Sequence, residues 1–355
     1  MKNVALIFGG KSGEHYVSIK TAFSISQSMD YTKYKVTPVY ITLEGKWLMK
    51  EAYSQKPVNS VEFEDMNTYT ELENFVSFFA NMDVAFPAIH GPNGEDGTLQ
   101  GFLELMDIPY VGSGVASSAL GMDKILMKTV FQQYGIPQGL YMHFERSDIK
   151  EREQDLLLSI EQYLTYPMFV KPANLGSSVG ISKVRNTDEL KQALHFAARF
   201  DKKVLVEEFI KGRELEIGVL GNKELTTSEI GEVTTTKDFY DYQAKYEDQN
   251  VTQLHIPAPI PHSVKKRMEE IAKKTFLKLE CKGLSRIDFF WDEEKDALYV
   301  NEINTLPGFT PSSMYPMLFK EVGVSYSTLI DSLISLGFET HKEKKENEII
   351  TMQTK

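Results

Sequence analysis

Two carboxylates, an amide and a guanidinium lie toward the C-terminus with a spacing that suits metal-assisted chemistry on phosphates. Arg286 and Asp288 alternate with apolar residues, so a β-strand would place both on one face. After a polar turn at residues 292–296, Glu302 and Asn304 alternate in the same way. If the two faces coincide, the oxygen ligands that Mg²⁺ prefers converge beside a guanidinium. A hairpin whose charges simply face water has the same pattern, so the alternation by itself leaves both interpretations open.

The turn that follows favours the chemical interpretation. Residues 306–310 contain a proline and then Gly308, whose backbone N–H can approach a ligand closely because glycine has no side chain. A metal site next to a backbone donor is suited to phosphoryl transfer, which depends on charge neutralisation and positioning.

A second group of candidates surrounds a run of small residues. A predicted strand at residues 166–172 carries Lys171 directly before a proline, and Ser177 and Ser178 follow in the glycine-rich segment 174–181. Small residues with free N–H and hydroxyl groups can surround phosphate oxygens. A Gly-Ser-Ser-x-Gly segment is a weak signal by itself, and the lysine on the preceding strand makes the combination more specific.

Two glycine-containing loops form the third group. The loop 9–15 follows a short apolar strand and precedes an amphipathic helix at residues 17–29, as in the first unit of a βαβ layer. Its Glu14 either complements the dipole of that helix or faces a ligand. The loop 90–97 begins with His90 and belongs at the carboxyl edge of the sheet, where α/β proteins bind ligands. A structural role for this histidine is the alternative.

The segments RIDFF and NEINTLPGFT, together with the motifs above, resemble the D-alanine–D-alanine ligases of the ATP-grasp family. The resemblance covers residues 2–337, and the motifs follow one another in the family's order. It implies an enzyme that uses ATP to join two D-alanines through an acyl phosphate, a step in the synthesis of peptidoglycan precursors. It further implies Mg²⁺ or Mn²⁺ with two ions in each site, and a homodimer in the cytoplasm.

The resemblance also implies a role for each candidate residue. The metal ions are bound by Asp288, Glu302 and Asn304. Arg286 stabilises the transition state, together with the N–H of Gly308. Glu14 binds the ammonium of the first D-alanine, and His90 lies beside this substrate. Ser313 and Met314 are further substrate-binding residues. Another set binds ATP: Lys124, Lys171, Ser178, Glu207, Glu214 and Lys245. For Lys124, an exposed helix lysine is the alternative.

The second substrate depends on Ser177 and on a predicted lid. Residues 238–246 combine four aromatic residues with polar ones and have no clear period, which is typical of a loop that closes over a site. A cluster of aromatic residues at a strand edge is the alternative. Relatives that form depsipeptides carry phenylalanine where Tyr246 stands, so tyrosine indicates dipeptide synthesis. An acceptor such as D-lactate or D-serine, or a catalytically silent ATP-binding module, remains an alternative function.

The composition describes an ordinary globular protein. The net charge of −11 disfavours nucleic acid or an anionic membrane as the main partner. Cys281 is the one cysteine, so no intrachain disulfide can form, in agreement with a reducing compartment. No run of eighteen or more apolar residues is present, and we expect no transmembrane segment.

The predicted fold class is α/β (α+β), an N-terminal βαβ layer followed by an ATP-grasp fold of two α+β subdomains. We expect boundaries after residues 121 and 205, and a disordered charged tail at residues 339–355. Within these parts we predict further elements: no regular structure at 50–69, a helix at 71–80, a strand at 108–111 and a final helix at 325–336.

Overall fold

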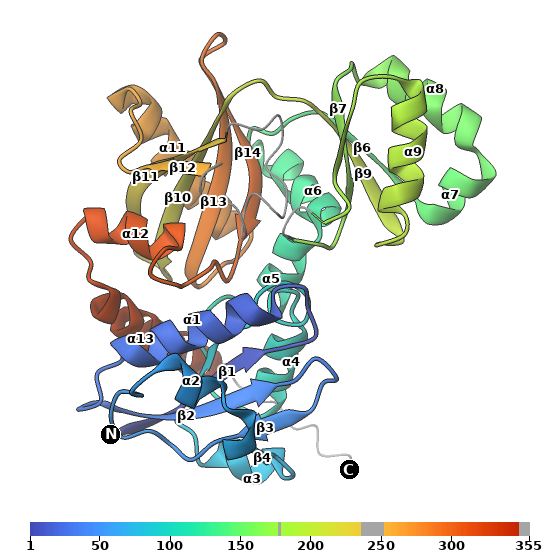
Figure 1. The fold of residues 1–355 in the computed structure, drawn as a ribbon. Coiled ribbons are helices and arrows are strands. Elements are labelled where there is room, and N and C mark those ends of the chain that lie inside the picture. Colours follow the sequence, from blue (N-terminus) through green and yellow to red (C-terminus); the bar gives the residue numbers. More distant parts are fainter. Residues whose placement is uncertain (177–178, 236–251, 348–355) are drawn as a thin grey trace, which may run out of the picture.

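The computed structural model describes residues 1–176, 179–235 and 252–347. Three β-sheets form its framework, with the chain passing from the first to the second and then to the third (Figure 1). The mixed helix and strand content confirms the predicted fold class.

The N-terminal sheet has the strand order β4-β3-β2-β1-β5. Strand β1 (Lys2–Gly9) pairs in parallel with β2 (Tyr34–Ile41), and helix α1 (His15–Ser28) connects them, which confirms the predicted βαβ unit. Strand β5 (Val84–Pro87) pairs in parallel with the other side of β1. The short strands β3 (Trp47–Met49) and β4 (Thr70–Glu71) complete the sheet in antiparallel pairing.

The second sheet has the order β6-β9-β7-β8 and is antiparallel. Its strands are β6 (Tyr141–Glu145), β7 (Met168–Pro172), β8 (Ser182–Val184) and β9 (Lys203–Glu208). Helices α7 (Arg146–Glu151), α8 (Glu153–Tyr163) and α9 (Thr187–Ala197) lie on one side of it (Figure 1). Val170 and Val206 point into the core beneath the helices. The next residue on each strand, Lys171 and Glu207, therefore points to the opposite face.

The third sheet, of order β12-β11-β10-β13-β14, is antiparallel and carries the predicted metal hairpin. Its strands are β10 (Arg213–Gly221), β11 (Leu225–Thr235), β12 (Thr252–His255), β13 (Gly283–Asp292) and β14 (Ala297–Asn304). Helix α11 (His262–Lys278) packs on Ile217 of β10 in one core cluster. Helix α12 (Met314–Glu321) packs on the neighbouring Gly218, on the other face.

Helix α6 (Lys124–Tyr134) lies between the second and third sheets (Figure 1). It begins where the side chain of Asp123 accepts hydrogen bonds from the N–H groups of Ile125 and Leu126, at 3.1 and 3.2 Å. Helices α4 (Thr98–Leu105) and α5 (Val115–Met122) precede it, and the short α5 was not predicted.

Three local predictions are wrong. The helix predicted at 71–80 begins only at Phe75, as α3 (Phe75–Ala80), because the Asn74 side chain caps it by accepting from the N–H of Ser77. Residues 50–69 are not irregular: they contain α2 (Ser60–Glu64) and a 3₁₀ helix, η1 (Met66–Thr68). The strand predicted at 108–111 is a single bridge between Ala85 and Tyr110.

The last helix is longer than predicted. Helix α13 (Tyr326–Lys345) continues past residue 336, and Leu329 and Leu333 on it join the core of the N-terminal sheet. Disorder was therefore wrongly predicted for residues 339–345. Charged side chains of this segment are paired with α4 and the residues after it: His341 and Lys345 with Asp107, and Lys344 with Glu104. The rest of the predicted tail, from residue 348, lies outside the described residues.

Candidate active site

A cavity of about 300 Å³ lies between the second and third sheets. The second sheet contributes Lys171 and Glu207, and the third contributes Glu214 and the charged face of the β13–β14 hairpin. Helix α6 adds Lys124 and Lys128. Cationic and anionic groups from distant parts of the chain thus face one space, as a site for a charged ligand requires.

The β13–β14 hairpin brings the two predicted polar faces together. Arg286 is paired in register with Asn304, and Asp288 with Glu302. The Asp288 carboxylate accepts from Nε and Nη2 of Arg286, both at 2.7 Å, and from Nδ2 of Asn304 at 3.0 Å. Nε of Arg286 also lies 2.9 Å from Glu216. Burial alone would lower the pKa of Arg286, but the carboxylates of Asp288 and Glu216 hold that pKa well above its ordinary value.

The hairpin offers oxygen ligands for a metal ion but no closed cage. Within the described ranges, no cluster of three or more His, Cys, Asp or Glu residues could hold an ion by itself. Magnesium commonly takes one or two carboxylates and completes its coordination with water and substrate phosphates. Asp288 and Glu302 with the amide of Asn304 therefore fit an ion that arrives with a phosphate ligand. Manganese prefers the same oxygen ligands.

Buried ion pairs connect α6 to the second sheet. Glu207 lies 2.6 Å from Nζ of Lys128 and 2.5 Å from Nζ of Lys171. Burial by itself raises the pKa of Glu207, yet the two ammonium groups lower it to about 2. The predicted ATP ligands Lys171 and Glu207 are thus partners of one another, and the sequence indicated no role for Lys128.

Lys124 is buried rather than an exposed helix lysine. Its Nζ donates to the carbonyl of Leu175 at 2.8 Å and lies 3.7 Å from Glu302. The ammonium therefore joins the small-residue segment after β7 to the metal hairpin. A phosphate bound there would meet a positive charge beside the carboxylates that hold its metal ion.

Glu14 lies where loops from different parts of the chain meet. It is the residue before α1, and its carboxylate approaches Gly91 so closely that an added Cβ would lie 2.6 Å from its Oε2. Gly91 also has a φ of 72°, which favours glycine. A Cβ at Gly176 would lie 3.5 Å from the same oxygen. Glu14 therefore faces the loop after β5 and the segment after β7.

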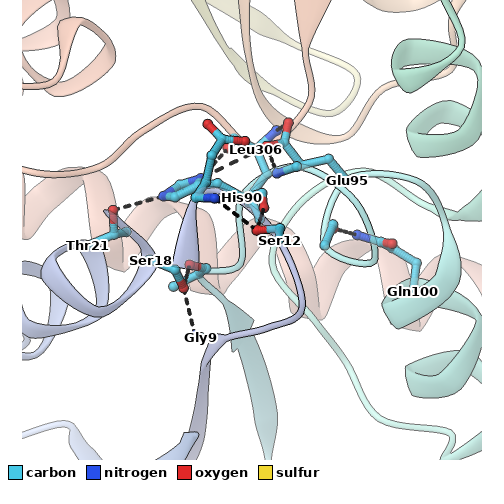
Figure 2. A network of polar contacts seen from close by, with 12 residues as sticks. Gly9, Ser12, Ser18, Thr21, His90, Glu95, Gln100 and Leu306 are labelled. Atoms are coloured by element: carbon cyan, nitrogen blue, oxygen red, sulfur yellow. Dashed lines mark hydrogen bonds and ion pairs between the residues drawn. The ribbon is translucent and has the colours of Figure 1, made fainter. Parts of the chain in front are cut away.

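A network of polar contacts surrounds His90 (Figure 2). Nδ1 of His90 lies 3.2 Å from the carbonyl of Leu306, and Nε2 lies 2.8 Å from the hydroxyl of Thr21. Because a carbonyl can only accept, Nδ1 carries the proton and Nε2 accepts from Thr21. The buried ring is fully hydrogen-bonded, so its direct contacts are structural, and it fixes the turn after β14 relative to α1.

Glu95 is a component of this network that sequence reasoning missed. It accepts from the N–H groups of Gly91 at 2.9 Å and Leu306 at 3.4 Å, and lies 3.9 Å from Nδ1 of His90. Burial, followed by the nearby carboxylate of Glu14, raises the pKa of Glu95 to about 8. An acid inside a glycine-rich loop next to His90 was the available signal, but its burial depends on Leu306, 211 residues away.

The remaining substrate candidates lie around the start of α12. Ser313 accepts from the N–H of Thr310 at 3.0 Å, and Gly308 is directly adjacent to it. The side chain of Met314 is buried together with Val233 and Leu318, so it is part of the hydrophobic core. Four candidates and the predicted lid lie outside the described residues: Ser177, Ser178, Lys245, Tyr246 and residues 238–246.

The comparisons with known proteins agree along the chain. The family described as "D-ala D-ala ligase N-terminus" matches residues 3–113, and "D-ala D-ala ligase C-terminus" matches residues 130–335. A D-alanine--D-alanine ligase of Bacillus pumilus is 48% identical over an alignment of 354 residues, which covers 97% of this chain and 98% of that protein.

Solved structures agree as well. The VanG D-Ala:D-Ser ligase of Enterococcus faecalis has a TM-score of 0.83 at 36% identity, covering 95% of this chain and 99% of that one. A D-alanine--D-alanine ligase of Bacillus anthracis complexed with ATP has a TM-score of 0.75 at 28% identity, and the match covers 97% of this chain and 100% of that one. The charged β13–β14 hairpin that faces a lysine-lined cavity agrees with these matches. The matches show that the chain belongs to the D-alanine–D-alanine ligase family, with the ATP-grasp fold.

Proposed function

We propose that this protein joins two D-alanines to D-alanyl-D-alanine at the expense of ATP, through an acyl phosphate, for peptidoglycan precursor synthesis. The observation that carries the proposal is the cavity between the second and third sheets, where Arg286, Asp288 and Glu302 face Lys124 and Lys171. Anionic groups for a metal and cationic groups for phosphates are the parts that phosphoryl transfer requires.

ATP occupies this cavity in the proposal. Lys124 and Lys171 contact its phosphates, while Glu207 and Glu214 lie toward its adenine and ribose. Glu207 already holds Lys171 at 2.5 Å, so its first task is to keep that ammonium in place for the phosphates. Two Mg²⁺ or Mn²⁺ ions on Asp288, Glu302 and Asn304 would neutralise phosphate charge when bound.

The first D-alanine lies at the junction of loops around Glu14, whose carboxylate holds the ammonium. Its carboxylate attacks the γ-phosphate of ATP, ADP leaves, and an acyl phosphate forms. The amine of the second D-alanine, oriented by Ser177, then attacks the acyl carbon and releases phosphate. Arg286 and the N–H of Gly308 stabilise the oxyanion of that step, an effect worth ~3 kcal/mol for each donor.

Water must be kept from the acyl phosphate during this sequence. Residues 238–246 act as the lid in the proposal, with Tyr246 bonded to Glu14 and Ser177 when the lid is closed. A closed lid also removes bulk water from Arg286, which strengthens its interaction with the oxyanion.

The test is ADP release by the purified protein with ATP, Mg²⁺ and D-alanine, together with identification of the product. We expect D-alanine-dependent ADP release with D-alanyl-D-alanine as the main product. Parallel reactions in which D-serine or D-lactate is offered as the second substrate test the acceptor. ADP release that does not respond to D-alanine would contradict the proposal, and so would a preferred product that contains D-serine or D-lactate.

The setting of the enzyme is also part of the proposal. Among the described residues, no helix is long and apolar enough to cross a membrane. We place the reaction in the cytoplasm, where ATP is available, and expect a homodimer. Light scattering on the purified protein measures the mass of the particle, and a monomer at working concentration would contradict the dimer.

A further inference from the structure

A second cavity of about 300 Å³ lies on the helical side of the second sheet. Residues of α7 and residues at the C-terminal end of α9 line it: Arg146, Ile149, Lys150, His195, Ala198 and Arg199. None of them lines the active-site cavity. Helices α7 and α9 lie on the side of this sheet away from the β13–β14 hairpin (Figure 1). The cavity is therefore separate from the ATP site.

The cavity has a concentration of positive charge that carboxylates do not neutralise. Within the part of the chain that the structure describes, no ion pair involves Arg146, Lys150 or Arg199, although the chain has a net charge of −11. His195 is different, because its Nε2 lies 2.5 Å from Glu153. The guanidinium of Arg199 lies 5.8 Å from the ring of Phe196, which helps to orient it.

Arg146 provides a second, independent observation. Its Nε is buried and has no hydrogen-bond partner in the described structure. A buried donor without an acceptor is costly, and in folded proteins such donors are nearly always satisfied by protein, water or ligand. An anion in the cavity would supply the acceptor.

Helix dipoles do not explain the cluster. Lys150 lies in the last turn of α7 and Arg199 lies two residues after the end of α9, so both charges complement the negative ends of helices. Arg146, however, is the first residue of α7, where the dipole disfavours a cation. Three like charges around one cavity also repel each other, and a bound anion removes that repulsion.

We propose that this cavity binds a small phosphorylated molecule, of the diphosphate or phosphate-ester class. The planar guanidinium groups of Arg146 and Arg199 suit phosphate oxygens in two-point contacts, and Lys150 adds a point charge. Ile149 and Ala198 provide an apolar surface for a small organic group. The volume of about 300 Å³ is at the lower end of ligand pockets and is sufficient for such a molecule.

The experiment titrates inorganic pyrophosphate into the full-length protein by calorimetry. The active site is first saturated with Mg²⁺ and a non-hydrolysable ATP analogue, so that only other sites can respond. The test variant is Arg146→Gln/Arg199→Gln. The control, Lys266→Gln/Lys273→Gln on α11, removes the same charge from a helix on the third sheet.

For the wild type we expect saturable binding of one pyrophosphate. The arginine double variant should bind at least about tenfold more weakly, and the α11 control should stay within about twofold of wild type. Lys150→Gln, an exposed single change that leaves the fold intact, should weaken binding about threefold or more. The absence of saturable binding to wild type at millimolar pyrophosphate would overturn the proposal, as would equal weakening in the α11 control. Circular dichroism melting verifies that each variant is folded.

Discussion

The side chain of Arg286 is held in place by two carboxylates. Its guanidinium lies 2.7 Å from Asp288 and 2.9 Å from Glu216, and its side chain is only 12% exposed. A group held on two sides cannot swing away, so in the proposed mechanism Arg286 is already oriented when charge develops on the substrate. Glu216 therefore contributes by positioning Arg286, although the sequence did not suggest a role for it.

Replacement of Glu302 tests the metal hairpin at the residue scale. Glu302→Gln keeps the size of the side chain but removes the charge that a metal ion needs. We expect ligation to fall by ~10²-fold or more with little change in melting temperature. The control is Glu294→Gln in the turn of the same hairpin, where the carboxylate pairs with Lys211 at the surface. Near-normal turnover of Glu302→Gln at saturating Mg²⁺ would mean that the metal assignment is wrong.

The raised pKa of Glu95 should make the stability of the protein depend on pH. Its pKa of about 8 in the folded protein lies above the ordinary value of 4.5, so the unfolded chain loses this proton first as the pH rises. The free energy of unfolding therefore falls between about pH 4.5 and about pH 8. Glu95→Gln removes this pH-dependent loss of stability. Between the two ends of that window, the free energy of unfolding of the variant should therefore rise relative to wild type by on the order of a few kcal/mol.

Chemical denaturation at several pH values measures this difference. Glu73→Gln, which removes an exposed carboxylate from the same domain, serves as the control. A constant difference for Glu95→Gln would show that Glu95 is ionised in the folded protein throughout the window.

Tyr246 determines the choice of acceptor in our interpretation. An amine must arrive uncharged to attack, whereas the hydroxyl of D-lactate has no proton to lose first. Tyr246→Phe should therefore raise the use of D-lactate relative to D-alanine by up to ~10²-fold, most visibly at low pH where the competing amine is protonated. Competition between labelled D-alanine and D-lactate from about pH 6 to about pH 9 measures the product ratio. A ratio that does not move would contradict this role.

At the scale of elements, α12 can lie flat on the third sheet only because β10 has a glycine beneath it. A Cβ at Gly218 would lie 2.7 Å from the ring of Phe319 and 3.1 Å from that of Tyr315. Gly218→Ala should thus lower the free energy of unfolding by about 1–3 kcal/mol. Within α4, a Cβ at Gly101 meets nothing within 4 Å, so Gly101→Ala should raise the free energy of unfolding by roughly 0.5–1 kcal/mol. Urea denaturation compares the two, and stabilisation by Gly218→Ala would show that α12 can shift freely.

The end of α13 is the second prediction at this scale. A chain that stops after Phe338 loses the contacts of His341, Lys344 and Lys345 with Glu104 and Asp107. Exposed ion pairs are individually weak, so we expect the melting temperature to fall by only ~2–4 °C relative to a chain that stops after Asn347. Equal melting temperatures would show that this part of α13 contributes nothing to the stability of the fold.

In the whole molecule, the N-terminal and C-terminal parts share one core and one site. Leu329 and Leu333 of α13 pack with residues of β1, although most of the C-terminal part belongs to the third sheet. Near the site, Leu306 contacts both His90 and Glu95. A change in the position of the N-terminal sheet would therefore move the turn that carries Gly308. The boundaries after residues 121 and 205 stay predictions.

The sequence by itself determined the features that follow from local periodicity. Alternation placed Arg286 and Asp288 on one face of their strand, and Glu302 and Asn304 on one face of the next strand. Whether the two faces coincide was decided by the fold, because a register shift after Asp288 pairs Asp288 with Glu302 and Arg286 with Asn304. The βαβ unit at the N-terminus followed from the same kind of pattern, an apolar strand with a glycine turn and an amphipathic helix.

Only the tertiary structure decided how charges far apart in the chain are paired. Glu207 was predicted to bind ATP and Lys128 had no predicted role, and nothing in the sequence indicated that helix α6 and strand β9 bury them as an ion pair. The pairing of Lys344 with Glu104 spans 240 residues. Local sequence patterns report which face of an element is apolar, but the packing of elements determines which polar groups lose water. That loss of water produces the buried ion pairs and the raised pKa of Glu95.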